Sequence, residues 1–361
     1  MRRILIPLVV LCFVFAMTSA AFAKEPLTPE INFDKAVEMA KDKSRSLQSA
    51  KLDIERAEKV RDAAGSKVKY IPITTSPSPD SAASAVLSWK QADLNSQMSK
   101  LSYSVEEDAL LLQVYQLYNG LLQALEEVKV AEAQLKSTNV QHINAAANYR
   151  VGILNKEGMV QSDSSLASAK TKLEEAKKAL DDAYQKFNQL VGLNTEDKPV
   201  LTESPKFEPL NVDNLYAEVE RIMDQNPSIW EVDQKIDLAK LAVDIYQFNS
   251  PTEADSIYAK RIDVEKAQVT SADTKEQARK AIRTLYYSIK QLEEQYYSAQ
   301  ESLKLSEEKL RVVRIKYEVG MVTKADVLAA EADLAKCKQT LLDLAAQHEN
   351  SVFTFYKPWA V

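Results

Sequence analysis

The feature that most constrains the fold is an internal repeat with a fixed spacing of 168 residues. The pattern Tyr-x-Val-Gly at residues 149–152 returns at residues 317–320, and the spacing holds without a gap on both sides of the shared glycine. Matching apolar pairs at this spacing include Val114 and Ile282, Leu117 and Leu285, Leu121 and Ile289, Leu166 and Leu334, Leu173 and Leu341, and Phe187 and Phe355. Such a repeat indicates that one supersecondary unit occurs twice.

Within each copy the apolar residues recur at alternating steps of three and four. In the second copy the positions of this series are Ile282, Leu285, Ile289, Leu292, Tyr296, Ala299, Leu303, Ser306, Leu310, Val313 and Tyr317, and after Gly320 the series resumes as Leu334, Cys337, Leu341, Leu344, His348, Ser351 and Phe355. This is the heptad spacing of a coiled coil. The whole chain has only 6 glycines in 361 residues, so few residues interrupt a helix. The sequence therefore predicts an all-α fold of two tandem, long antiparallel coiled-coil hairpins.

The predicted helices are too long for a single globular core. The first long helix, about residues 85–150, would reach roughly 100 Å at 1.5 Å per residue. A shorter helix is expected before each hairpin, at about residues 33–68 and 212–247. Helices of this length must pack side by side, within the chain or between subunits.

The chain divides into four parts. Residues 1–23 have the layout of a secretory signal peptide, with Arg2 and Arg3, an apolar stretch, and a small-residue cleavage site ending at Ala23. The alternative is an uncleaved N-terminal anchor. Residues 24–193 form the first repeat, with its tip near Gly152, and residues 212–361 form the second, with its tip near Gly320. Residues 194–211 contain three prolines and are interpreted as the linker.

Composition excludes several classes of function. Without residues 1–23 the chain has 44 Lys and Arg against 52 Asp and Glu, so it has no basic surface for nucleic acid. His142, His348 and Cys337 lie too far apart for metal-ligand spacing, and neither a phosphate-binding loop nor a nucleophile elbow occurs. We expect no enzyme activity, cofactor or metal. The two histidines fall on the heptad seam, where we expect them at helix interfaces or leaning to solvent, although either could titrate near neutral pH.

Two stretches resemble the TolC-type outer membrane efflux family. The first runs from Tyr317 to Leu328 and continues into Ala332, Leu334 and Ala335; the second is Asn226-Pro227-Ser228-Ile229. The resemblance implies that three subunits close into a hollow helical barrel, a homotrimer. It also implies an efflux conduit that works with a periplasmic adaptor (membrane fusion) protein and an inner-membrane pump.

The sequence departs from this family where membrane-spanning β-strands are expected. A spanning strand needs about 9–11 residues of alternating polarity. Residues 70–83 contain Pro72, Pro77 and Pro79, which disrupt strand pairing, and residues 248–256 are fewer still. We therefore predict that the transmembrane β-hairpins are reduced or lost. The expected location is the periplasm or cell envelope, or an association with the outer membrane, and no transmembrane helix is expected after the signal peptide.

The candidate functional residues lie at the two turns. Val151, Gly152 and Ile153 at the first, and Val319, Gly320 and Met321 at the second, match the tips with which the family contacts its adaptor; the alternative is a plain hairpin turn. By the same resemblance Asp326 would line the entrance of the lumen. It could instead be an ordinary first-turn acid stabilised by the helix dipole. The first repeat has Gly158 at the matching position.

Two functions remain open from the sequence. The first is a non-enzymatic efflux conduit in which hollow shape and tip contacts do the work. The second is a structural coiled-coil spacer or adaptor of the envelope that conducts no substrate.

Overall fold

The computed structural model describes residues 28–69, 79–249 and 254–361, and in this part of the chain the predicted all-helical fold is confirmed. Four helices form the first repeat and four the second; one short strand precedes the first helix, another lies in the linker, and one 3-10 turn follows the last helix. In chain order they are β1 (Glu30–Ile31), α2 (Phe33–Lys43), α3 (Arg45–Lys69), α4 (Pro79–Arg150), α5 (Lys156–Val191), β2 (Val200–Leu201), α6 (Leu215–Asp224), α7 (Pro227–Asn249), α8 (Ala254–Glu318), α9 (Lys324–Tyr356) and η1 (Pro358–Ala360).

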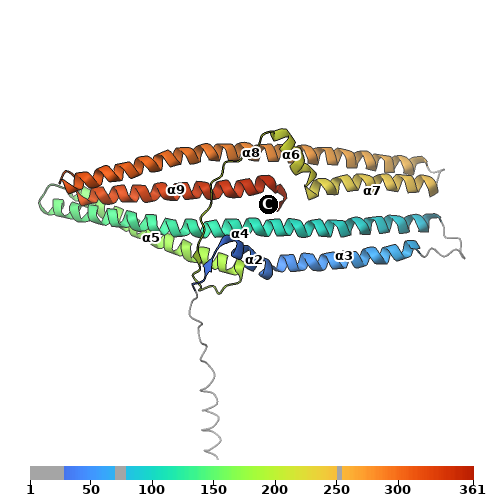
Figure 1. Cartoon of the computed structure of the whole chain (residues 1–361), viewed down its shortest axis with the longest axis horizontal. Helices are drawn as coiled ribbons and strands as arrows, with labels where there is room; N and C mark the ends of the chain where they lie inside the picture. The colour runs from blue at the N-terminus through green and yellow to red at the C-terminus, as the bar shows by residue number, and fades with distance from the viewer. Residues whose placement is uncertain (1–27, 70–78, 250–253) are drawn as a thin grey trace, which may run out of the picture.

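Two helices run the full length of a narrow rod (Figure 1). Helix α4 has 72 residues, or about 108 Å at 1.5 Å per residue, and α8 has 65. Helix α5 packs on the half of α4 nearer the glycine turn and α3 packs on the other half, while α9 and α7 divide α8 in the same way. Both glycine turns therefore lie at one end of the rod, and α3 and α7 end at the other.

The prediction of single helices at residues 33–68 and 212–247 was wrong, because each is broken in two. Ser44 has an extended backbone (ψ 113°), and its hydroxyl accepts a hydrogen bond from the Leu47 N–H at 3.2 Å, so a new helix begins there. In the second repeat the break precedes Pro227, which has no N–H and is suited to the first position of a helix. The side chain of Asn226 accepts the Ser228 N–H at 2.9 Å.

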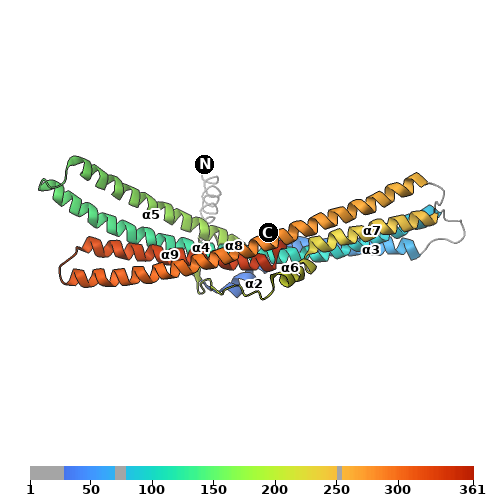
Figure 2. The same ribbon diagram turned by 90° about the horizontal axis from the view of Figure 1, so that it is seen from above.

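The core consists of two clusters near the middle of the rod, one in each repeat. Val114, Leu121 and Phe187 are buried in the first cluster, and their counterparts 168 residues later, Ile282, Ile289 and Phe355, are buried in the second. Equal burial at equal repeat positions confirms that one hairpin design occurs twice. From this middle region the hairpins α4–α5 and α8–α9 diverge toward their tips (Figure 2).

A minimal parallel ladder connects the start of the described chain to the linker. Glu30 pairs with Val200 and Ile31 with Leu201. Tyr118 of α4, which is buried, supports the ladder through its hydroxyl, which donates to the Ile31 carbonyl at 3.3 Å and accepts the Glu203 N–H at 3.1 Å. The linker is therefore attached to the first repeat before it crosses to the second.

Some sequence predictions fall outside the described residues. The predicted signal peptide, residues 1–23, is one of them. The prediction of lost β-hairpins concerned residues 70–83 and 248–256; of these, residues 70–78 and 250–253 are not described, and the others lie in α4, α7 and α8. None of the helices in the described ranges combines the length and apolar character that crossing a lipid bilayer requires.

Candidate functional site at the hairpin tips

Each hairpin turns through a glycine in the left-handed conformation. Gly152 has φ +74° and Gly320 has φ +75°. At the first tip the Ile153 N–H donates to the Asn148 carbonyl at 2.9 Å, and the equivalent bond at the second tip is 2.8 Å. This bond closes a helix C-terminus by the Schellman pattern, which requires positive φ and so favours glycine. The predicted turn glycines are confirmed as structural elements.

The residues that flank these glycines expose large apolar side chains. Val151 and Ile153 at one tip, and Val319 and Met321 at the other, are each about two-thirds exposed or more. Both tips lie at the same end of the rod, on hairpins that have separated from one another (Figures 1 and 2). Exposed apolar side chains gathered at one end are typical of an interaction site.

Asp326 is engaged in the start of α9. Its carboxylate accepts the backbone N–H of Thr323 at 2.7 Å and the Thr323 hydroxyl at 2.8 Å, and the Thr323 side chain in turn accepts the Asp326 N–H. This reciprocal arrangement is a capping box. The hydrogen bonds from Thr323 lower the pKa of Asp326, because they favour the ionised carboxylate.

The first tip begins its returning helix differently. Asn155 caps α5 by accepting the Gly158 N–H at 2.8 Å. A Cβ added to Gly158 would lie 2.5 Å from Cδ1 of Leu154, so the Leu154 side chain occupies the space that the aspartate side chain uses in the second repeat. The two tips therefore share a turn but differ in polarity just beyond it.

A buried polar cluster in the second repeat was missed by the sequence analysis. One carboxylate oxygen of Glu293 accepts the Leu210 N–H at 2.7 Å and lies 3.5 Å from Nε2 of His348. Lys290 donates to the other Glu293 oxygen at 2.8 Å and to the Leu210 carbonyl at 2.6 Å. The cluster thus binds both polar groups of one linker residue. The equivalent positions in the first repeat are Leu122, Leu125 and Leu180. The cluster could therefore have been found from the positions at which the two repeats differ in polarity.

The two histidines occupy different surroundings. His348 is buried against Glu293, as predicted for a helix interface. His142 is half-buried at the α4–α5 contact, with Nδ1 3.3 Å from the Ser162 hydroxyl and 3.6 Å from the Asp163 carboxylate. Cys337, which the heptad spacing places on the seam, is only half-buried.

The end of the second repeat folds back onto α4. Asp108 accepts a hydrogen bond from Nε1 of Trp359 at 2.8 Å and forms an ion pair with Lys357. The 3-10 turn η1 is fixed against the first repeat by these contacts. The linker and the last residues of the chain therefore both join the two repeats near the middle of the rod.

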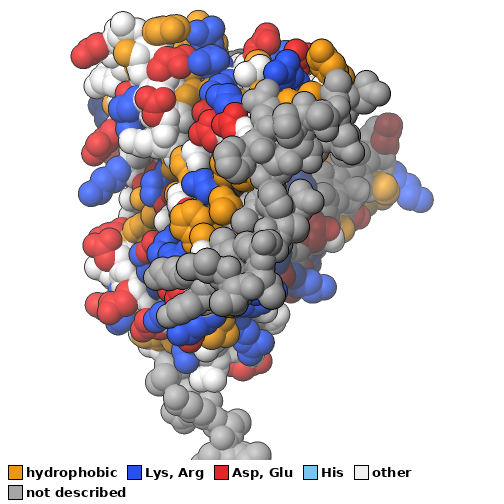
Figure 3. All heavy atoms as spheres, turned by 90° about the vertical axis from the view of Figure 1, so that its right-hand side faces the viewer, with side chains coloured by type: hydrophobic (Ala, Val, Ile, Leu, Met, Phe, Trp, Pro, Cys, Tyr) orange, Lys and Arg blue, Asp and Glu red, His pale blue; other side chains and the backbone are white. Residues whose placement is uncertain are grey.

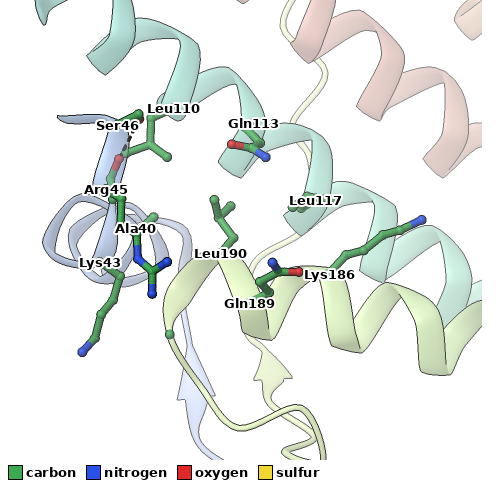
Figure 4. Close-up of a pocket in the computed structure, with 12 residues that line it drawn as sticks. Ala40, Lys43, Arg45, Ser46, Leu110, Gln113, Leu117, Lys186, Gln189 and Leu190 are labelled. Atoms are coloured by element: carbon green, nitrogen blue, oxygen red, sulfur yellow. Dashed lines mark hydrogen bonds between the residues drawn. The ribbon is translucent and has the colours of Figure 1, made fainter. Parts of the chain in front are cut away.

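An open notch of about 690 Å³ lies where α5 ends and α3 begins on α4. Leu190 points into it from α5, with Leu110 and Leu117 on α4 and the polar side chains of Gln113 and Arg45 at its edge (Figure 4).

No group of three or more potential metal ligands occurs in the described ranges. Acidic and basic side chains are interspersed on the face seen from the end opposite the tips (Figure 3), so this face has no single sign of charge.

Comparison with known proteins connects this geometry to a family. Residues 238–359 match the family model described as outer membrane efflux protein. Of the solved structures, CusC superimposes with a TM-score of 0.68 at 15% sequence identity, covering 92% of this chain and 93% of CusC. The chain has the TolC-type fold. Other TolC-type structures agree: the outer membrane channel CmeC of Campylobacter jejuni gives a TM-score of 0.65 at 14% identity, covering 95% of this chain and 90% of CmeC.

The outer membrane protein VceC of Vibrio cholerae gives 0.63 at 13% identity, covering 91% of this chain and 96% of VceC. No curated protein matches the sequence. The TolC-type resemblance inferred from the second tip lies within the residues matched by the family model, whereas the likeness of the first repeat rests on structure alone.

Proposed function

We propose that this chain is a subunit of a homotrimeric, non-enzymatic TolC-type efflux conduit in the envelope, and that the hairpin tips bind a periplasmic adaptor of an inner-membrane pump. One observation carries the proposal: a helix face that is buried on α4 is exposed and mostly apolar on α8. The shared fold and the family match of the second repeat support it.

The buried face of α4 contains residues that lie on one side of the helix. Leu94, Leu112, Asn119 and Ser137 are separated by 7 or 18 residues, spacings that return to the same side. Asn119 donates to Glu349 of α9 at 2.9 Å, so this side faces the second repeat. Ser137 is 1% exposed and Asn119 is 3% exposed.

The four counterparts on α8 are all exposed in the described part of the chain: three are large and apolar, and the fourth, Lys280 at the position of Leu112, is charged. Leu305, the counterpart of Ser137, is 72% exposed, and Tyr287, the counterpart of Asn119, is 64% exposed. Ile262 and Val269 extend this face along α8, and both are exposed. We call Ile262, Val269, Tyr287 and Leu305 the α8 outer face. A row of exposed large apolar residues at positions designed for burial indicates a missing neighbour.

Helix α5 of a second copy is the neighbour we propose. Within the chain α9 covers α4, and α5 is the repeat counterpart of α9. Val160 on α5 is exposed, whereas its counterpart Leu328 on α9 is buried. Repeating the α4–α9 contact between copies joins different surfaces head to tail, and such contacts close into a ring when the rotation permits. Three copies would enclose the lumen that the TolC-type fold implies, with Asp326 repeated three times near its entrance.

The oligomer is tested by native mass spectrometry and negative-stain imaging of residues 24–361. We expect a trimer and a tube of about 100 Å or more. Leu305→Glu and Tyr287→Glu should yield monomers, because each places a charge in the contact. Gln300→Glu is the matched control, because Gln300 and its counterpart Glu132 are both exposed. A monomeric parent chain, or trimers in the Leu305→Glu variant, would refute the arrangement.

The tips are tested separately by photo-crosslinking in cells from Ile153 and Met321, with the exposed Tyr216 on α6, near the middle of the rod, as the control position. We expect the tip positions, but not the control, to capture an adaptor-type protein. A trimer whose tips capture none would favour the spacer function.

A further inference from the structure

We propose that Lys290, Glu293 and His348 form an acid-sensitive joint that binds linker residues 206–210 to the second hairpin at neutral pH and releases them on mild acidification. This inference does not depend on the conduit function. It rests on the geometry of a buried polar cluster that the first repeat lacks.

The linker segment 206–210 is attached to the second repeat at both of its ends. At one end the backbone N–H and the charge of Lys206 lie beside the carboxylate of Glu349 on α9 and favour its ionised form. At the other, Glu293 and Lys290 of α8 bind the N–H and the carbonyl of Leu210. Leu210 is buried and belongs to the core cluster of the second repeat. Releasing this segment therefore uncovers part of that core.

His348 lies beneath the middle of this segment. The Phe207 ring stacks on Tyr296 with centroids 3.7 Å apart and lies 4.7 Å from the His348 ring. Because an ionised carboxylate only accepts hydrogen bonds, Nε2 of His348 must carry the proton that faces Glu293. A second proton would be placed on Nδ1, at a ring that is 1% exposed and packed under an aromatic side chain.

The charges in the cluster balance only while His348 is neutral. Lys290 is positive and Glu293 is negative, and the Glu293 carboxylate already accepts bonds from Lys290 and Leu210. Burial lowers the pKa of His348 despite the nearby Glu293. Burial alone would raise the pKa of Glu293, but the bonds from Lys290 and the Leu210 N–H outweigh it, so its pKa is lowered.

The direction of the pH effect follows from these shifts. In the released state His348 is hydrated and titrates near its ordinary value of 6.5, whereas in the joined state it resists protonation. Acid therefore favours release below about pH 6.5, and Glu293 adds to this only near and below its ordinary value of 4.5. Glu349 on α9 opposes it, because burial raises its pKa and the joined state takes that proton more readily.

Hydrogen exchange by mass spectrometry at pH 7.5 and pH 5.5, corrected for the intrinsic pH dependence of exchange, tests the joint on the full chain. The internal control is the nearby linker segment at residues 200–202, whose N–H groups pair with Pro29 and Ile31 and face no histidine. We expect the protection of segment 206–210 to fall about tenfold relative to this control. This magnitude follows because the uptake of one proton over about one pH unit below 6.5 changes the release equilibrium about tenfold. Equal protection ratios at the two pH values would overturn the proposal.

Variants separate the contributions of the individual residues. His348→Gln should abolish the relative loss of protection, whereas Glu349→Gln should leave it intact or enlarge it. A loss that persists in His348→Gln would contradict the assignment. If His348→Gln does not fold, NMR titration of the parent chain decides, with His142→Gln identifying the resonance because the chain has only two histidines. A His348 midpoint at or above 6.5 would also overturn the proposal.

Discussion

Removing one hydroxyl group tests the account of how the linker is attached to the first repeat. In Tyr118→Phe the ring remains in the core, but the hydroxyl that bridges the Ile31 carbonyl and the Glu203 N–H is lost. The Ile31 carbonyl keeps the Thr202 N–H as a partner at 3.2 Å, so only the Glu203 N–H loses its bond outright. Tyr286→Phe is the matched control, because Tyr286 is the repeat counterpart and its hydroxyl has no hydrogen-bond partner in the described structure.

The expected magnitude has two parts. Losing one hydrogen bond costs about 0.5–1.5 kcal/mol, and leaving a partly buried N–H unpaired costs about 1–3 kcal/mol, so we expect about 1.5–4.5 kcal/mol in total. With an unfolding entropy of about 2.1 cal/mol/K per residue, this lowers Tm by about 2–6 °C for a chain of this size.

The assay is calorimetric and urea unfolding of both variants beside the parent chain. Tyr286→Phe should change the free energy of unfolding by less than about 0.5 kcal/mol, as is usual away from buried polar contacts. If the two variants lose equal stability, or if Tyr118→Phe loses less than the control, the bridging role of this hydroxyl is refuted.

Three further results are expected. Gly320→Ala should destabilise the chain by about 1–2 kcal/mol in urea unfolding, because φ is +75° at this residue. Gly120→Ala inside α4 should instead stabilise the chain by about 0.5–1 kcal/mol, because an added Cβ meets no atom within 4 Å. The opposite order of stabilities would contradict the turn geometry. Asp326→Asn should destabilise the chain at pH 7. Because the pKa of Asp326 is lowered, the difference in stability between the variant and the parent chain should vanish only well below pH 3.8, the ordinary pKa of an aspartate. Urea unfolding at pH 7 and pH 2.5 measures this difference. Asp108→Ala should free residues 357–361 for carboxypeptidase digestion, since Lys357 and Trp359 lose their shared partner; unchanged resistance would count against that contact.

The functional residues divide into those with a local signal and those without one. The turn glycines could be predicted, because glycine adopts a positive φ without steric cost and because the residues around it recur in both repeats. The capping role of Asp326 was one of two alternatives in the sequence, and the structure places its carboxylate on Thr323. Any role of the tips and of Asp326 in binding or in a lumen stays a prediction. The cluster around His348 had no local signal, since a seam position accepts leucine or histidine alike.

The sequence by itself determined the hairpins: their number, their length, their turns and the residues that face each other within them. This follows because heptad spacing and glycine conformation act over a few residues. Tertiary structure alone decided what each hairpin meets on its other sides. Ser137 and Leu305 occupy the same repeat position, yet one is buried and the other is exposed, because their surroundings depend on contacts between segments far apart in the chain.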